Sequence, residues 1–208
     1  MRTFTLVFLG LLFVIQYCSS SPQHELNKNN ELYKQVVNDF VKLARPYVER
    51  FGKICEHMLE TLKEHETDSD YEDVKDRLDE AVEAAKHLEN SDQDVVMKYL
   101  LRSAEQLLAA TFEHKEPEAN KHLFYTLFNN KENEEVLEEF EKSFQEYFDG
   151  FNVEYGKNIS EDENESNPDL LKWFKSFLKA HSGKNFAEQF VALVKFFNLF
   201  NPDLFLRE

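Results

Sequence analysis

Residues 30–62 read NELYKQVVNDFVKLARPYVERFGKICEHMLETL, and their apolar side chains recur every three or four positions. The main apolar row consists of Leu32, Val36, Phe40, Leu43, Tyr47, Phe51, Ile54, Met58 and Leu62. This spacing predicts an amphipathic α-helix, because residues three and four apart share one helix face. Pro46 lies inside the pattern. Its missing N–H and its ring predict either a kink or two helices, the second starting near Pro46.

The same helical spacing continues from this segment to the C-terminus, and no stretch shows the strict alternation of a β-strand. A long helix should follow residue 130 and end at Gly150, Gly156 and the polar run 157–167. The other expected helices cover residues 74–88, 92–114, 117–128, 168–182 and 184–200. We therefore predict an all-α fold, a single compact bundle of seven or eight amphipathic helices over residues 30–208. Residues 21–29 should form a flexible N-terminal segment.

Residues 1–20 have the pattern of a secretory signal peptide. Arg2 gives a positive start, residues 4–17 are almost wholly apolar, and small residues precede a cut after Ser20. The apolar run is too short for a comfortable membrane span, and polar sequence follows it at once. We expect this segment to be cleaved and the mature protein to be secreted into the extracellular space, without stable insertion in a membrane.

The composition excludes several classes of function. The 208 residues carry a formal net charge of −16, so nucleic acid repels the chain and no nucleic-acid partner is expected. The 5 glycines are too few to favour Gly-rich phosphate loops or nucleophile elbows, which need glycine at fixed positions. The 20 phenylalanines and 8 tyrosines supply the apolar area that an ordered core requires.

Cysteine usage predicts a fold without disulfides. Cys18 leaves with the signal segment, so Cys55 is the only thiol expected in the mature chain. Cys55 is in line with Phe51, Leu59 and Leu62 on the apolar face of its helix, which predicts a buried and inert side chain. The alternative is an exposed thiol that links two copies into a covalent homodimer.

No sequence pattern typical of covalent or metal catalysis is present. The chain lacks G-x-S-x-G, a Walker loop, H-E-x-x-H and the E-x-x-H turns of di-iron bundles. Two pairs of acid and histidine, Glu83 with His87 and Glu118 with His122, are spaced i,i+4 and are typical of solvated helix surfaces. We expect no enzymatic activity, no metal site and no cofactor.

Two sites of modification are predicted in the polar run 157–167. Asn158 and Asn164 each begin an N-x-S sequon, the acceptor pattern for N-glycosylation. Two sequons in the most polar segment of the chain fit an exposed loop. In a eukaryotic secreted protein both asparagines are therefore candidates for glycosylation.

The last feature of the sequence that bears on function is its rows of aromatic residues. Rings on facing apolar stripes are contributed by Phe140, Phe144, Phe148, Trp173, Phe174, Phe177, Phe190 and Phe197. The favoured interpretation is a close-packed core. One alternative is an internal pocket for an apolar ligand, since bundle interiors commonly hold such sites. Another is a C-terminal face, residues 186–206, that docks on a partner or on a second copy.

Three functional hypotheses follow. The preferred one is a secreted, non-enzymatic protein of the effector or body-fluid type that acts by protein–protein interaction through a helix face. The second is a soluble extracellular carrier of an apolar small molecule, such as a fatty acid or a sterol, in the bundle interior. The third, an enzyme with an unfamiliar site, has the least support from the motifs.

Overall fold

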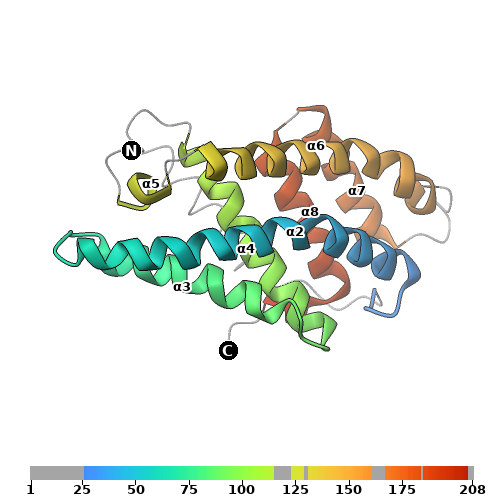
Figure 1. Cartoon of the computed structure of the whole chain (residues 1–208). Coiled ribbons are helices and arrows are strands. Elements are labelled where there is room, and N and C mark those ends of the chain that lie inside the picture. The colour runs from blue at the N-terminus through green and yellow to red at the C-terminus, as the bar shows by residue number, and fades with distance from the viewer. Residues whose placement is uncertain (1–25, 115–122, 129–130, 161–166, 184, 206–208) are drawn as a thin grey trace. The chain divides into compact units, whose positions relative to one another are not determined.

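The computed structural model describes residues 26–114, 123–128, 131–160, 167–183 and 185–205, and every regular element in these ranges is helical. Seven α-helices occur there (Figure 1): α2 (Glu31–Leu62), α3 (Tyr71–His87), α4 (Gln93–His114), α5 (Leu123–Phe128), α6 (Lys131–Ser160), α7 (Pro168–Ser182) and α8 (Phe186–Phe200). Two short 3-10 helices follow α2 and α8: η2 (Lys63–His65) and η4 (Pro202–Phe205). The all-α prediction is confirmed. The signal segment and the expected helix start at Pro117 lie outside the described residues.

Pro46 does not divide the first helix. α2 is one continuous helix with Pro46 inside it, so the prediction of a second helix starting there is wrong. Pro46 is exposed, which lets water hydrate the carbonyl group that loses its hydrogen bond. The fully buried neighbours Ala44 and Val48 anchor the turns on either side, and this packing outweighs the local cost of the proline.

The sixth helix is longer than the glycines suggested. α6 passes through Gly150 and Gly156 and ends at Ser160, so the predicted loop does not begin at residue 157. Tyr155 and Ile159 are fully buried, and their packing holds the last turns in helical form. A Cβ at Gly156 would lie 3.2 Å from the Phe174 ring, so glycine here permits a close approach to α7.

The described chain divides into two compact units. Unit 1 contains Met1–Asn38 and Gln145–Glu208, and unit 2 contains Asp39–Phe144. Within unit 1, α7 and α8 pack against each other, and within unit 2, α3 packs against α4 and α5. The long helices α2 and α6 each contribute one part to unit 1 and the other part to unit 2.

The core of unit 2 forms where α2 and α3 approach each other closely. Gly52 lies so near to Ala85 that a Cβ on the glycine would collide with the alanine side chain. A partly buried hydrogen bond also occurs in this unit, in which the Arg45 guanidinium donates to the Leu88 carbonyl at 2.9 Å. The Arg77 guanidinium lies 3.8 Å above the centre of the Phe124 ring, a cation–π contact that holds α5 against α3.

The core of unit 1 is built mainly from aromatic rings. Phe151 of α6 lies 4.8 Å from Phe177 and 5.9 Å from Trp173 of α7, measured between ring centres. Phe196 of α8 completes the group at 4.9 Å from Trp173. The Trp173 indole N–H donates to the Ala192 carbonyl at 2.6 Å, so the one polar atom of this ring is satisfied inside the core.

Candidate functional site

The predicted aromatic residues are divided between the two units. Phe140 and Phe144 lie in unit 2, with their ring centres 4.5 Å apart. The others lie in unit 1: Phe148, Trp173, Phe174, Phe177, Phe190 and Phe197. All eight side chains are buried.

Where these rings meet, they contact one another rather than enclose space. The separations of 4.8, 4.9 and 5.9 Å among Phe151, Trp173, Phe177 and Phe196 are those of directly packed rings. A ligand cannot lie between rings at such distances. The buried rings Phe151 and Phe196 belong to this cluster but were absent from the predicted set, although both follow the apolar spacing of their helices.

Cys55 is buried, as its place on the apolar face of its helix predicted. Its side chain is fully inaccessible to solvent. Burial raises the pKa of the Cys55 thiol to about 12, and the nearby Arg77 guanidinium opposes this shift. A thiol in this position cannot reach a second copy of the folded chain, so the covalent homodimer has no support from the structure.

One of the two glycosylation candidates lies in a helix and not in the expected loop. Asn158 belongs to the last turn of α6, and Asn164 lies outside the described residues. The polar run therefore starts as helix, and residues 161–166 separate the end of α6 from Asn167, which caps α7. The Asn167 side chain accepts from the Asp169 N–H at 2.9 Å, a standard N-cap that fixes the start of α7.

Among the described residues, no three histidine, cysteine, aspartate or glutamate side chains converge in a way that could hold a metal ion. The predicted pair Glu83–His87 is present, with 2.9 Å between Oε1 and Nε2. In the same described part of the chain, each helix is too short or too polar to traverse a bilayer.

A groove between α3 and α4 in unit 2 has the features of a binding site. Its volume is about 560 Å³, within the range of small-molecule pockets. α3 contributes Asp76, Asp79, Glu80, Val82, Glu83, Ala84 and Lys86, and α4 contributes Tyr99, Arg102, Ser103 and Gln106. Four carboxylates against two basic side chains give this lining a formal net charge of −2.

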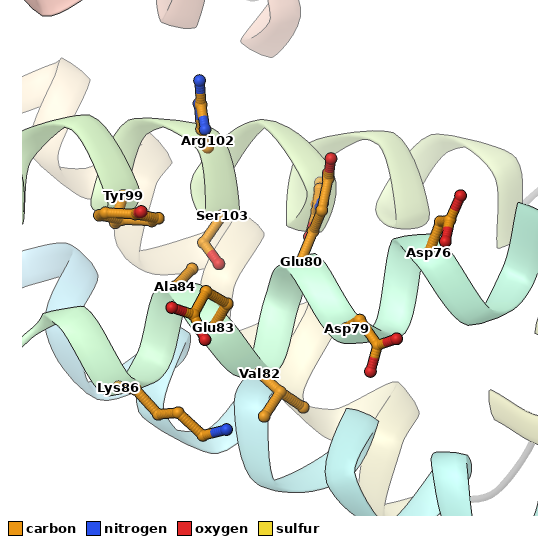
Figure 2. A pocket seen from close by; sticks show the side chains of 11 residues that line it. Asp76, Asp79, Glu80, Val82, Glu83, Ala84, Lys86, Tyr99, Arg102 and Ser103 are labelled. Atoms are coloured by element: carbon orange, nitrogen blue, oxygen red, sulfur yellow. The ribbon is translucent and has the colours of Figure 1, made fainter. Parts of the chain in front are cut away.

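The groove follows from the same spacing on both helices. Along α3, the residue number increases by three, one and three from one carboxylate to the next. This spacing places Asp76, Asp79, Glu80 and Glu83 on one helix face. The polar residues of α4 have the identical spacing: Tyr99, Arg102, Ser103 and Gln106. Ser103 projects from α4 toward α3, whereas Arg102 extends away from α3 (Figure 2). The small side chains of Ala84 and Ser103 leave the space between the helices.

Most of the groove's carboxylates have partners on the protein. Asp79 lies 2.8 Å from the Lys75 ammonium, and this hydrogen bond raises the pKa of Lys75 above its ordinary value. Glu83 contacts His87, whose ring stacks on Tyr99 with the ring centres 4.0 Å apart. The stacking of His87 on Tyr99 holds the tyrosine ring in place.

Two buried oxygen atoms in the groove lack hydrogen bonds. Ser103 is 1% exposed, and its Oγ has no partner among the described residues. Gln106 donates from Nε2 to Glu80 Oε2 at 3.0 Å, which leaves its buried Oε1 likewise without a partner there. A buried polar atom without a hydrogen bond costs about 1–3 kcal/mol, so two in one groove require an explanation.

Thr111, the other buried hydroxyl residue of α4, differs from Ser103 in its hydrogen bonding. Thr111 is also buried in α4, and its Oγ1 donates to the Leu107 carbonyl one turn earlier at 2.8 Å. Serine and threonine in helices commonly satisfy themselves in this way. Ser103 does not, and its hydroxyl is directed instead into the space between α3 and α4.

A second hollow lies along α7 in unit 1 and differs in charge. Its volume is about 490 Å³, and its lining includes Lys172, Lys175 and Lys179 with Pro168 and Leu171. The three lysines are exposed. This hollow contains no buried polar atom without a partner among its lining residues, so it carries less evidence of a ligand than the groove of unit 2.

Sequence reasoning did not identify the groove. It recognised the Glu83–His87 pair as a surface feature, but it did not place the polar row of α4 opposite the acidic row of α3. The available signal was a polar row with helical spacing that contains the buried Ser103 among apolar neighbours. Predicting the groove from this row requires knowing which helices are neighbours, and the spacing within one helix does not contain that information.

Comparison with known protein families, with characterised proteins and with solved structures finds no match for this chain. No relative therefore supplies a reaction, a ligand or a set of site residues. The chemistry of the groove and of the two aromatic cores is the basis on which a function can be proposed.

Proposed function

We propose that this chain is a secreted, non-enzymatic protein that acts by binding a positively charged partner protein in the groove between α3 and α4. The observation that supports this most directly is the acidic lining of a groove of about 560 Å³. Carboxylates arranged on one face raise the local concentration of cations and speed the encounter with a basic partner. Secretion is supported by the signal-like residues 1–20.

The groove suits a protein partner because its walls are open to the surroundings. Asp76, Asp79, Glu80 and Glu83 are all exposed, so their charges face solvent and can meet a partner's surface. The preferred hypothesis from the sequence is protein–protein interaction through a helix face, and the acidic face of α3 is a candidate for that face. The partner's matching feature would be a segment rich in lysine or arginine.

The carrier hypothesis has weaker support. It places an apolar ligand among the predicted rings, yet Trp173 and Phe177 pack directly against each other and against neighbouring rings. Phe140 and Phe144 are likewise in contact in the other core. Bulky rings that already touch favour filled space over a cavity. The carrier hypothesis therefore stays an alternative without an observation in its favour.

Secretion can be tested by expressing the full chain in eukaryotic cells. We expect the protein in the medium, with Ser21 as its first residue. Treatment with a glycosidase that removes N-linked sugars should lower its mass if Asn158 or Asn164 is modified. Retention of residues 1–20 on a protein that stays inside the cell would contradict the proposal.

Binding can be tested with octalysine as a defined basic probe, measured by isothermal titration at two salt concentrations. We expect binding that weakens as salt increases, because screening reduces the attraction between exposed charges. The double variant Asp76→Asn with Glu83→Gln should weaken binding severalfold, since it removes two charges from the groove.

A matched control removes two charges from another surface of unit 2. Glu135 and Glu138 of α6 are exposed, and Glu135 pairs with Lys131 as Glu83 pairs with His87. The double variant Glu135→Gln with Glu138→Gln should bind octalysine like the unchanged protein. If both double variants weaken binding equally, the attraction comes from net charge alone and the groove is not the binding site.

A further inference from the structure

We propose that the partner in the groove between α3 and α4 is a second copy of this chain, which contributes a row of lysines on its α7. This lysine row consists of Lys172, Lys175 and Lys179, which line the hollow along α7. The inference rests on the proposed function for the location of the site, and it names the partner. Its consequence is a weak self-association of the protein.

The lysine row is a local exception to the acidic character of the chain. Among the α-helices of the described chain, α7 alone has a net positive formal charge, because its three lysines outnumber its one acidic residue, Asp169. The lysines are three and four residues apart and therefore share one helix face. All three are exposed, and none forms an ion pair with the described residues. The row is available to a negatively charged partner surface.

The acidic row of α3 has the spacing that complements the lysine row. Asp76, Asp79 and Glu83 are three and four residues apart, as are the lysines. Asp76, Glu80 and Glu83 are four and three apart, which gives the same match when one helix is reversed. Each row extends about 10 Å along its helix, so three ammonium–carboxylate pairs can form together. Because both rows belong to one chain, a second copy supplies the complement of each.

Apolar side chains accompany both rows. Pro168 and Leu171 line the hollow with the lysines, and Val82 and Tyr99 line the groove with the carboxylates. A lysine stem packs on such surfaces while its ammonium group reaches a carboxylate. Contact between the two faces would exclude water from the ion pairs, and a charge pair attracts more strongly where water is excluded.

The net charge of the chain opposes this association, and salt separates the two effects. Two copies with a formal charge of −16 repel each other at long range. At physiological salt, charges separated by more than about 8 Å are largely screened, whereas ion pairs in direct contact persist. We therefore expect association near physiological salt, weaker association at very low salt and none near 1 M salt, where the pairs are also screened. Association through apolar surface alone would persist at 1 M salt.

The first test measures the mass of the purified protein by sedimentation equilibrium, at protein concentrations from about 0.01 to 1 mM. Exposed ion pairs are individually weak, so we expect the mean mass at physiological salt to rise above about 0.1 mM protein. Near 1 M salt the protein should be monomeric. A protein that is monomeric up to about 1 mM at every salt concentration overturns the inference.

The second test reverses the charge of each row separately. The lysine-row variant carries K172E, K175E and K179E, and the acidic-row variant carries D76K, D79K and E83K. Each variant alone should associate at least about tenfold more weakly than the unchanged protein, because its two rows then have the same sign. A one-to-one mixture should associate again, since every row then meets one of opposite sign. A mixture that stays monomeric overturns the inference.

A matched control changes the net charge by the same amount at other positions. Lys53, Lys63 and Lys142 are exposed and lie outside α3 and α7. The triple variant K53E, K63E and K142E should associate more strongly than the lysine-row variant. If the two variants lose association equally, net charge alone explains the loss and the lysine row is not the contact.

The outcomes distinguish failure of this inference from failure of the proposed function. The lysine-row variant should still bind octalysine, because its groove is unchanged. If octalysine binds in the groove and the unchanged protein stays monomeric, the function stands and the inference is overturned. If octalysine does not bind and the protein stays monomeric, both are overturned. If the protein stays monomeric while octaglutamate binds the lysine row, that row meets an acidic partner of another kind and the inference is overturned.

Discussion

Cys55 illustrates how a single buried residue reports on the fold. Its position in line with Phe51 on the apolar face of α2 indicated burial, and the side chain is fully inaccessible. Because a thiolate is poorly stabilised away from water, burial raises the pKa of Cys55 to about 12. The thiol is therefore neutral and unreactive in the folded protein at physiological pH.

Alkaline pH should destabilise the protein through Cys55. The folded pKa is about 12 and the ordinary value is 9.0, so between these pH values the unfolded chain has lost a proton that the folded chain retains. The free energy of unfolding then falls as pH rises above 9, by about 1.4 kcal/mol per pH unit. Guanidinium unfolding at pH 8 and pH 10.5 measures the change.

The variant Cys55→Ala isolates this effect from other groups that titrate at high pH. The loss of stability between pH 8 and pH 10.5 should be about 2 kcal/mol smaller in the variant than in the unchanged protein. An aromatic disulfide reagent at pH 8 should label Cys55 only after unfolding. Equal losses in the two proteins, or rapid labelling of the folded one, would show that the thiol is accessible.

At the scale of elements, two glycines in helices should respond oppositely to substitution by alanine. Gly52 of α2 has no room for a Cβ beside Ala85, whereas Gly150 of α6 has nothing within 4 Å of that position. Alanine favours a helix by about 1 kcal/mol relative to glycine. Gly150→Ala should therefore stabilise the protein by about 1 kcal/mol, and Gly52→Ala should destabilise it by about 1–3 kcal/mol through overpacking.

Thermal or chemical unfolding of the two glycine variants decides this prediction. Each serves as the control for the other, because both changes add one methyl group to a helix interior. If Gly52→Ala is as stable as Gly150→Ala, then α2 and α3 separate easily at this crossing and the close contact with Ala85 contributes little.

The helices themselves were largely predictable, because their evidence is local. Apolar spacing located each described helix, and Pro168 marked the first residue of α7. The errors occurred where a local signal competed with burial. Pro46 and Gly156 weaken a helix, yet fully buried neighbours such as Val48 and Tyr155 keep α2 and α6 intact.

The candidate groove could not be predicted in the same way. Its walls are ordinary solvated residues when each helix is considered alone, and Glu83–His87 was correctly expected as an i,i+4 pair. What makes the groove is that residues of α3 and α4 line it together, the acidic row of one helix with the polar row of the other. Such a pairing of helices depends on tertiary packing, which cannot be predicted from the residue spacing within one helix.

At the scale of the whole molecule, two continuous helices join the units. α2 passes from unit 1 to unit 2 after Asn38, and α6 passes from unit 2 to unit 1 after Phe144. Neither helix is interrupted at these points. Unfolding one unit would leave the ends of both helices without their packing partners, and short isolated helices are unstable in water. We therefore expect the described chain to unfold in one cooperative step.

The protein contains a natural probe in each unit. Trp173, the single tryptophan, reports on unit 1 by fluorescence, and the buried Cys55 reports on unit 2 by its reactivity toward thiol reagents. With guanidinium, the two probes should give the same midpoint. Phe177→Ala in unit 1 should lower the stability seen by both probes by about 3–5 kcal/mol, because it removes a fully buried ring.

Lys175→Ala, on an exposed position of the same helix, should move both midpoints by less than about 0.5 kcal/mol in stability. A shift of the Trp173 midpoint in Phe177→Ala with an unchanged Cys55 midpoint would mean that unit 2 folds alone. In that case α2 and α6 would act as linkers rather than as shared structural elements. The groove between α3 and α4, which lies entirely in unit 2, could then bind its ligand in the absence of a folded unit 1.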